Sequence, residues 1–249
     1  AIEADEDPYL VITGDLVHGP EIDPDEWPDH LGSFYHGDSP TLLRRARELQ
    51  EEFPSRVHYL LGNHEHAHIG GPVVSKFFPD EAQRLEALLG ARQSDSFRDW
   101  IATWPLCAIA PTARIGMMHA APHAQIESRE QLESVDLNLI GEHVELGVPE
   151  LVIPLLWART TSSERARSFL ATLDPRLLVA VYGHDVAHAG YAIDREPLLC
   201  ISTSFGCYDG DKLYLSWDLA RPVESAAELA EHGLLPLYPE AAPVHRAPT

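Results

Sequence analysis

Residues 57–65 have the sequence Val57-His58-Tyr59-Leu60-Leu61-Gly62-Asn63-His64-Glu65, in which a mostly apolar run ends at a glycine and three polar residues follow. A short apolar run closed by a glycine is typical of a strand in the interior of a sheet. We therefore predict a strand over Val57–Leu61, with Asn63 and His64 just beyond its carboxyl end.

The same pattern recurs along the chain. Tyr9–Thr13 is apolar and leads through Gly14 to Asp15, Ile115–Met118 leads directly to His119, and Leu177–Tyr182 leads through Gly183 to His184. In open α/β sheets, ligands bind beyond the carboxyl ends of the strands. We therefore expect Asp15, Asn63, His119 and His184 to converge. Their mixed oxygen and imidazole donors suit Mn, Fe or Zn better than Ca or Mg.

Helical segments separate these strands. Ser39-Pro40 is predicted to be the N-cap and first position of a helix through Glu52, Asp80 starts a helix that Gly90 ends, and Ser163 caps a helix through Leu173. Residues 19–40 are rich in proline, which indicates a long functional loop. Strands that alternate with helices predict an α/β fold.

The composition excludes several classes of protein. The chain has 249 residues, 45% of them hydrophobic, which is enough for a large core and too apolar for a disordered chain. Its 18 basic and 39 acidic residues give a net charge of −21, so no nucleic-acid partner is expected. Three cysteines without C-x-x-C spacing predict a reducing, cytoplasmic location. No apolar run reaches the roughly 20 residues of a membrane helix, so no membrane association is expected.

These motifs together resemble those of a known family. Gly14-Asp15, Gly62-Asn63-His64-Glu65, His119 and Gly183-His184 are similar, in order and spacing, to the signatures of the calcineurin-like metallophosphoesterases, in particular the phosphoprotein phosphatase (Ser/Thr protein phosphatase) branch. Leu155-Leu156-Trp157-Ala158-Arg159 resembles the Leu-Trp-x-Arg segment of bacterial members. The resemblance implies a four-layer α-β-β-α sandwich of two mixed sheets, with the metal site at the strand ends.

The resemblance also implies roles for individual residues. Asp15 would bridge two divalent transition-metal ions, with Mn favoured over Fe or Zn, and Asn63, His119 and His184 would complete the shell of the second ion. His64 would protonate the leaving alkoxide, and Arg159 would hold two phosphoryl oxygens. Two cations that polarise a phosphoryl group and activate a water are a coherent device for hydrolysis.

The sequence departs from the family at two places. The family's first motif, Asp-x-His, is expected about one strand-helix unit before Asp15, so we expect the native protein to continue upstream of Ala1, where the first ion's ligands would lie. The second motif usually has Asp-Arg where this chain has His18 and Gly19. We expect a metallophosphoesterase domain over residues 1–220, then a short helix and a Pro- and Ala-rich tail over residues 221–249.

Simpler interpretations exist for each residue. Asp15 could cap a turn, His119 could be a hydrogen-bonded core histidine, and Arg159 could be a surface arginine at a helix end. Glu65 is expected to support the site, and His66 and His68 to belong to a histidine-rich loop over it.

The function predicted is therefore metal-dependent hydrolysis of a phosphomonoester, with phosphoserine or phosphothreonine protein as the first choice of substrate. Two alternatives stay open: a phosphatase for small molecules or dinucleoside polyphosphates, and a catalytically weak member of the fold that binds its partner.

Overall fold

The computed structural model describes residues 8–135, 137, 148–201 and 211–240, in which helices and strands alternate as predicted. The helices are α1 (Ser39–Glu52), α2 (Asn63–His66), α3 (Glu81–Leu89), α4 (Ala91–Ile101), α5 (Arg129–Glu133), α6 (Val148–Trp157), α7 (Ser163–Leu173) and α8 (Ala226–Gly233). The strands are β1 (Leu10–Ile12), β2 (Val57–Tyr59), β3 (Cys107–Ala110), β4 (Ile115–Met118), β5 (Val179–Tyr182), β6 (Tyr191–Ala192), β7 (Leu198–Ile201), β8 (Leu213–Leu215) and β9 (Leu234–Pro236). Cys207 and the predicted tail beyond residue 240 lie outside the described residues.

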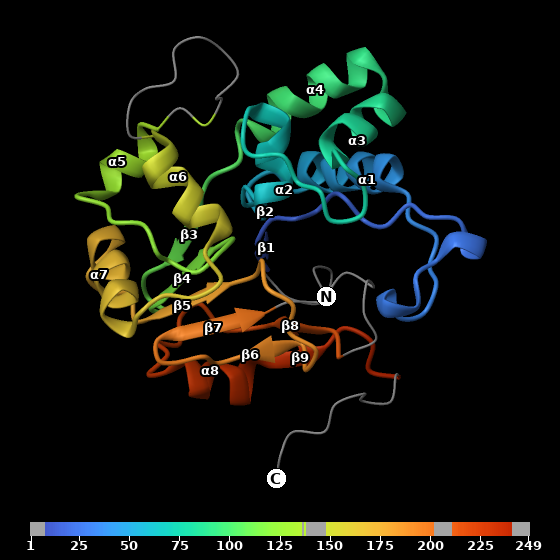
Figure 1. Cartoon of the computed structure of the whole chain (residues 1–249). Coiled ribbons are helices and arrows are strands. Elements are labelled where there is room, and N and C mark those ends of the chain that lie inside the picture. The colour runs from blue at the N-terminus through green and yellow to red at the C-terminus, as the bar shows by residue number, and fades with distance from the viewer. Residues whose placement is uncertain (1–7, 136, 138–147, 202–210, 241–249) are drawn as a thin grey trace.

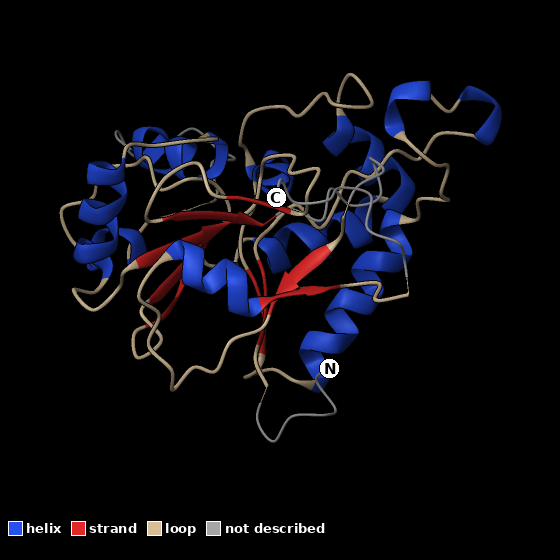
Figure 2. Ribbon diagram, turned by 90° about the horizontal axis from the view of Figure 1, so that it is seen from below, coloured by secondary structure: helices blue, strands red, loops and turns tan. Residues whose placement is uncertain are grey.

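The strands form a mixed sheet and two smaller ones (Figures 1 and 2). The five-stranded sheet has the order β3-β4-β5-β7-β6, with β4, β5 and β7 parallel and the two edge strands antiparallel to their neighbours. Strands β1 and β2 pair in parallel, and β8 pairs with β9 in antiparallel fashion. The predicted α/β class is confirmed, with one mixed five-stranded sheet.

The central strand β5 is buried on both faces, as its continuous apolar sequence predicts. Val179 and Val181 belong to a cluster that includes Leu229 of α8, whereas Ala180 and Tyr182 belong to the main core with helix α7. Successive side chains of a strand point to opposite faces, so α7 and α8 cover opposite sides of the sheet. Figure 1 shows α8 below the sheet and α7 at its other side.

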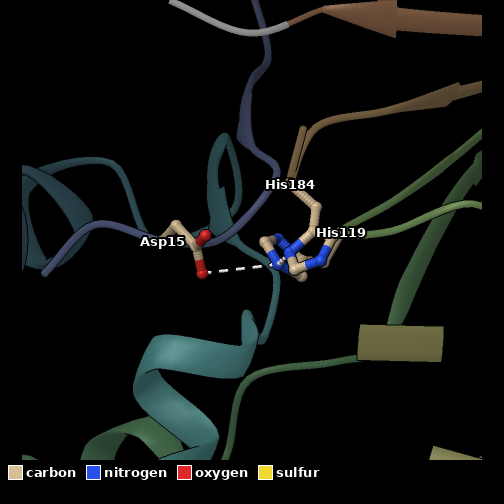
Figure 3. A group of neighbouring side chains, drawn as sticks. All are labelled: Asp15, His119 and His184. Carbon is tan, nitrogen blue, oxygen red and sulfur yellow. Dashed lines mark hydrogen bonds and ion pairs between the residues drawn. The ribbon is translucent and has the colours of Figure 1, made fainter. Parts of the chain in front are cut away.

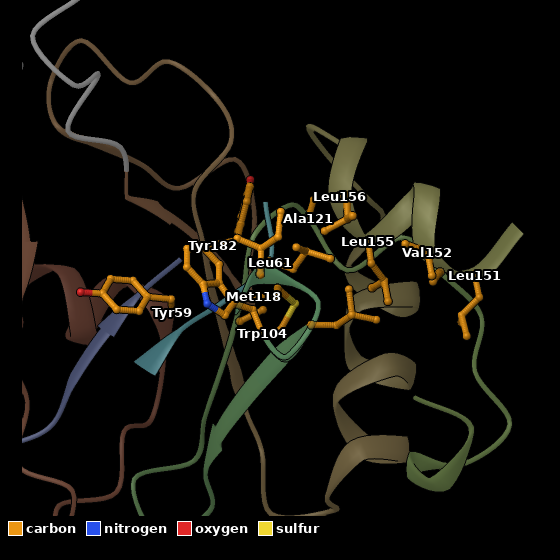
Figure 4. Packing of buried hydrophobic residues seen from close by; sticks show 14 of the residues in the cluster. Tyr59, Leu61, Trp104, Met118, Ala121, Leu151, Val152, Leu155, Leu156 and Tyr182 are labelled. Atoms are coloured by element: carbon orange, nitrogen blue, oxygen red, sulfur yellow. The ribbon is translucent and has the colours of Figure 1, made fainter. Parts of the chain in front are cut away.

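The main core joins the β1–β2 pair to the five-stranded sheet. Tyr59 of β2 stacks on Trp104 with ring centroids 5.1 Å apart, and the same cluster contains Met118 of β4 and Tyr182 of β5 (Figure 4). Helix α6 adds Leu155, which is buried. Full burial of each such side chain stabilises the fold by about 1.5–3 kcal/mol. This shared core fixes the carboxyl ends of β1, β2, β4 and β5 relative to one another.

Two helix starts differ by one residue from the prediction. Asp38, rather than Ser39, caps α1, because its Oδ1 accepts a hydrogen bond of 3.0 Å from the Thr41 amide. Ser162, rather than Ser163, caps α7. Each helix begins with two adjacent residues that can cap, and only the first has non-helical backbone. The predicted cap Asp80 is confirmed for α3.

The expected short helix after residue 220 is α8, which packs against the five-stranded sheet through the buried Leu229. The domain boundary at residue 220 remains a prediction. Within the described ranges, no helix combines the length and apolar character needed to cross a lipid bilayer.

Candidate metal centre

Four predicted ligands meet at the carboxyl ends of four strands. Asp15 follows β1, Asn63 follows β2, His119 follows β4 and His184 follows β5. His119 Nε2 lies 2.9 Å from Asn63 Oδ1, 3.1 Å from His184 Nδ1 and 3.3 Å from Asp15 Oδ1. His184 Nδ1 lies 3.0 Å from Asn63 Oδ1. Figure 3 shows Asp15 directed toward the two imidazoles. The structure thus brings together the set that the sequence predicts.

The atoms that face one another in this cluster are mainly acceptors. His119 Nδ1 lies 2.7 Å from the carbonyl oxygen of Thr13, which can only accept, so Nδ1 carries the ring proton and Nε2 presents a lone pair. That lone pair faces the oxygens of Asn63 and Asp15. Among the side-chain atoms that face one another here, His184 Nδ1 is the one that could donate a hydrogen to these acceptors. Acceptors crowded in this way are stabilised by a cation, and the donor set fits a divalent transition metal.

The environment keeps these groups in metal-binding protonation states. Burial lowers the pKa of His184 to about 4 and also lowers the pKa of His119, so both imidazoles are neutral near pH 7. Burial acts to raise the pKa of Asp15, but attraction to His119 and His64 lowers it overall. Asp15 is therefore an anion. The carboxylate and the neutral imidazoles are the forms that bind metal.

Unusual backbone conformations orient two of the candidate ligands. Asp15 has φ 53° and His184 has φ 66°, values that non-glycine residues seldom adopt. A Cβ atom at Gly62 would lie 2.5 Å from Asp15 Oδ1, so only glycine leaves room for the carboxylate at that place. Strained backbone is frequent at functional sites, where the surrounding structure must hold it.

Glu65 holds the strained segment after β1. Its carboxylate accepts hydrogen bonds from the amides of Asp15 (2.9 Å), Leu16 (2.7 Å), Val17 (3.2 Å) and Gly62 (3.1 Å). Burial and the nearby charge of Asp15 raise the pKa of Glu65, whereas the amide donors favour its charged form. The expected supporting position of Glu65 is therefore a direct one, through the backbone of a ligand residue.

His64 lies beside the cluster and outside it. Its Nε2 is 3.9 Å from Asp15 Oδ2, and its Nδ1 is 3.9 Å from Glu81 Oε2. The side chain is 12% exposed, so Nε2 can be reached by a molecule bound at the centre. The acid role of His64 remains a prediction.

Arg159 lies two residues beyond the end of α6 and is 60% exposed. Its Nη1 donates to Asp185 Oδ1 at 2.5 Å, and Asp185 directly follows the candidate ligand His184. The structure thus pairs the guanidinium with the residue that follows a candidate ligand, a partner that the sequence analysis did not identify. The position of Asp185 directly after Gly183-His184 is the sequence feature that could have identified this partner.

The sequence analysis also missed Glu81. This residue begins α3 and lies close to both His18 and His64. No motif marks it, because the path of the intervening chain decides where α3 lies in space.

Comparisons with known proteins agree with this geometry. The model of the family described as calcineurin-like phosphoesterase matches residues 1–216. Among solved structures, a serine/threonine protein phosphatase from Saccharomyces cerevisiae is similar with a TM-score of 0.52 and 15% identity, over 78% of this chain and 57% of that one. A cold-active protein tyrosine phosphatase is similar with a TM-score of 0.53 and 13% identity, over 82% of this chain and 62% of that one. The chain thus spans about six-tenths of the length of these structures. No curated protein matches it.

Proposed function

Because the chain belongs to the calcineurin-like phosphoesterase family, whose members are metal-dependent hydrolases, we propose that it hydrolyses phosphomonoesters at the centre formed by Asp15, Asn63, His119 and His184. The observation that carries this proposal is the convergence of four donor atoms from four strand ends, with lone pairs facing one another. When bound, divalent ions supply charge that polarises a phosphoryl group and favours ionisation of water.

Asp15 is proposed to bridge two ions, with Mn as the preferred metal. Its Oδ1 faces His119 Nε2, while its Oδ2 faces His64, so the two carboxylate oxygens point to different neighbours. Asn63, His119 and His184 would hold one of these ions. Mixed carboxylate, amide and imidazole donors suit Mn as well as Fe and Zn.

His64 is proposed as the general acid that protonates the leaving oxygen. Its imidazole lies on the side of Asp15 that His119 does not occupy, within reach of a phosphoester bound at the centre. A positioned general acid contributes about 100-fold to 10,000-fold to the rate, and more when the leaving group is basic.

Arg159 is proposed to bind the phosphoryl oxygens. Its side chain is exposed and pairs with Asp185, the residue after His184, and its planar fork can hold two oxygens at once. Asp185 orients the guanidinium through one of its nitrogens, which leaves other donors for a substrate.

We propose phosphoserine or phosphothreonine protein as the substrate and the cytoplasm as the location. The unpaired Cys107 and Cys200 fit a reducing compartment. Rates on phosphoserine, phosphothreonine and phosphotyrosine peptides, a small alkyl phosphate and a dinucleoside polyphosphate test the choice of substrate. Preference for the last two favours the small-molecule phosphatase, and binding without turnover of any of them favours the binding protein.

The test of the metal centre is Asp15→Asn. We expect loss of bound metal, measured by elemental analysis, together with loss of p-nitrophenyl phosphate hydrolysis. Asp99→Asn is the matched control, since Asp99 is an exposed aspartate on α4, and it should keep both. Unchanged metal content and activity in Asp15→Asn contradicts the proposal.

A further inference from the structure

A second group of polar side chains is buried next to the metal centre. His18 from the loop after β1, His64 from α2 and Glu81 from α3 meet with side-chain exposures of 1%, 12% and 2%. His18 Nδ1 lies 3.4 Å and His64 Nδ1 lies 3.9 Å from the same atom, Glu81 Oε2. We call these three residues the His18 cluster.

The three atoms that face one another in the His18 cluster are buried without a hydrogen-bond partner. The other carboxylate oxygen of Glu81 accepts from the Phe77 amide at 2.5 Å, so Oε2 alone points into the cluster. Each buried polar atom without a partner costs about 1–3 kcal/mol. Three such atoms in one place indicate that something binds between them.

The protonation of His18 follows from its neighbours. Arg98 forms an ion pair with Glu86 at 2.6 Å, so Glu86 is a carboxylate and His68 Nδ1 must donate to it at 2.9 Å. Burial lowers the pKa of His68, so its ring is neutral near pH 7 and accepts at Nε2 from His18 Nε2, at 2.9 Å.

The ring proton of His18 is therefore on Nε2, in the hydrogen bond to His68, and Nδ1 presents a lone pair to the Glu81 carboxylate. Burial also lowers the pKa of His18 to about 2, so a second proton is not available near neutral pH. An imidazole lone pair that faces a carboxylate oxygen is repulsive unless a metal cation or a shared proton lies between them.

We propose that His18 Nδ1, His64 Nδ1 and Glu81 Oε2 bind a divalent transition-metal ion of the zinc class, distinct from any ion held by Asp15 and His119. Metal–ligand bonds of about 2.0–2.2 Å in tetrahedral geometry separate neighbouring ligand atoms by about 3.3–3.6 Å. The 3.4 Å separation of His18 Nδ1 and Glu81 Oε2 lies within that range, and the 3.9 Å separation of His64 Nδ1 and Glu81 Oε2 lies just above it. Both separations exceed normal hydrogen bonds, and each of the three residues offers a ligand atom within 4.8 Å of those of the other two. Two imidazoles and one carboxylate are a frequent protein set for zinc.

A fourth ligand position can be filled by water. A cavity of about 10 Å³ borders His18 and Glu81, which is about the space that one water molecule needs. Arg84 also lines this cavity, but its guanidinium donates to the Glu21 carbonyl at 3.1 Å and lies 3.8 Å from the centroid of the Phe78 ring. The positive charge of Arg84 is therefore stabilised by the Glu21 carbonyl and the Phe78 ring.

Such an ion has a consequence for His64 that rests on the proposed function. Binding at Nδ1 leaves the ring proton of His64 on Nε2, the nitrogen that faces Asp15. The proposed acid would be held in one orientation and one tautomer. The binding of the ion itself does not depend on any catalytic activity.

Zinc stoichiometry tests the site. Protein stripped with a chelator is titrated with Zn²⁺, and bound zinc per chain is measured for wild type, Glu81→Gln, His184→Asn and His30→Asn, the last being the control because His30 is an exposed histidine. We expect Glu81→Gln to lose one zinc and to keep the zinc that His184→Asn loses. Equal zinc in Glu81→Gln and wild type overturns the proposal. Failure of the proposed function would instead show as absent hydrolysis with this zinc count intact.

A second measurement does not depend on the folding of any variant. Crystals of the zinc-loaded wild-type chain should give an anomalous difference peak about 2.1 Å from His18 Nδ1, His64 Nδ1 and Glu81 Oε2. A map with a peak at His119 and His184 and none in the His18 cluster overturns the proposal, since a shared proton would then account for the contacts.

Discussion

Replacing Glu65 with glutamine should destabilise the fold by about 2–6 kcal/mol. Glu65 Oε2 accepts from the amides of Asp15 and Gly62, and Oε1 accepts from those of Leu16 and Val17. Glutamine keeps one oxygen and replaces the other with an amide donor, so two backbone N–H groups lose their acceptor. Each loss costs about 1–3 kcal/mol for a buried group. A total stability of about 5–15 kcal/mol makes this a large fraction.

The assay is urea unfolding in the presence of a chelator, because a bound metal would add its own stabilisation to the folded state. The matched control is Glu48→Gln. Glu48 lies on α1 in an exposed ion pair with Arg44, and such pairs contribute only about 0.3–0.5 kcal/mol.

The same substitution should weaken metal binding, because Glu65 holds the backbone of Asp15 at φ 53°. The reasoning is refuted if Glu65→Gln unfolds within about 0.5 kcal/mol of the Glu48→Gln control. It is also refuted if the variant loses stability but binds metal as tightly as wild type, because Glu65 would then support the fold without positioning the ligand.

Three further predictions concern single side chains. His64→Asn should slow hydrolysis of an alkyl phosphate by about 100-fold to 10,000-fold and of an aryl phosphate with an acidic phenol much less, and equal losses in kcat would argue against the acid role. Arg159→Lys should lower kcat/KM by about 10-fold to 150-fold with metal content unchanged, and wild-type efficiency would place the phosphate site elsewhere. Burial lowers the pKa of His66 to about 4. Between that pH and about 6.5, His66 therefore binds a proton in the unfolded chain but not in the folded chain. The contribution of His66 to stability should be full above about pH 6.5 and fall by up to about 3 kcal/mol as the pH decreases toward 4. Urea unfolding of wild type and His66→Gln measures it as the difference in pH slope, and an unaltered slope in His66→Gln would contradict this.

The candidate metal ligands could be predicted because each lies one or two positions beyond an apolar run that contains a strand. Parallel strands place their carboxyl ends at the same edge, so a polar residue one or two positions past an apolar run is located in space by the sheet. His119 follows Met118 of β4 directly, and His184 follows β5 after one glycine. No long-range information is needed for such residues beyond the pairing of the strands.

Glu81 could not be predicted in this way. It lies on a helix whose position depends on the path of residues 67–80, and a chain of that length can reach many places. Glu81 lies in the first turn of α3, where acidic residues are common because they stabilise a helix N-terminus. Its residue type therefore indicates no other role. Similarly, the sequence cannot show that Arg159 is paired with Asp185, because both side chains are exposed and 26 residues apart.

Each of the four residues Gly62-Asn63-His64-Glu65 has different neighbours around the candidate metal centre. Their order along the chain therefore has a physical reason. Gly62 leaves room for the Asp15 carboxylate, and Asn63 faces His119 and His184. His64 lies between Asp15 and Glu81, and Glu65 accepts the amides of the loop that carries Asp15. A helical turn starting at residue 63 points successive side chains in different directions, so one turn reaches the centre, the His18 cluster and the opposing loop together. Exchanging Asn63 and His64 would preserve the composition of the turn but direct each donor to the wrong neighbour.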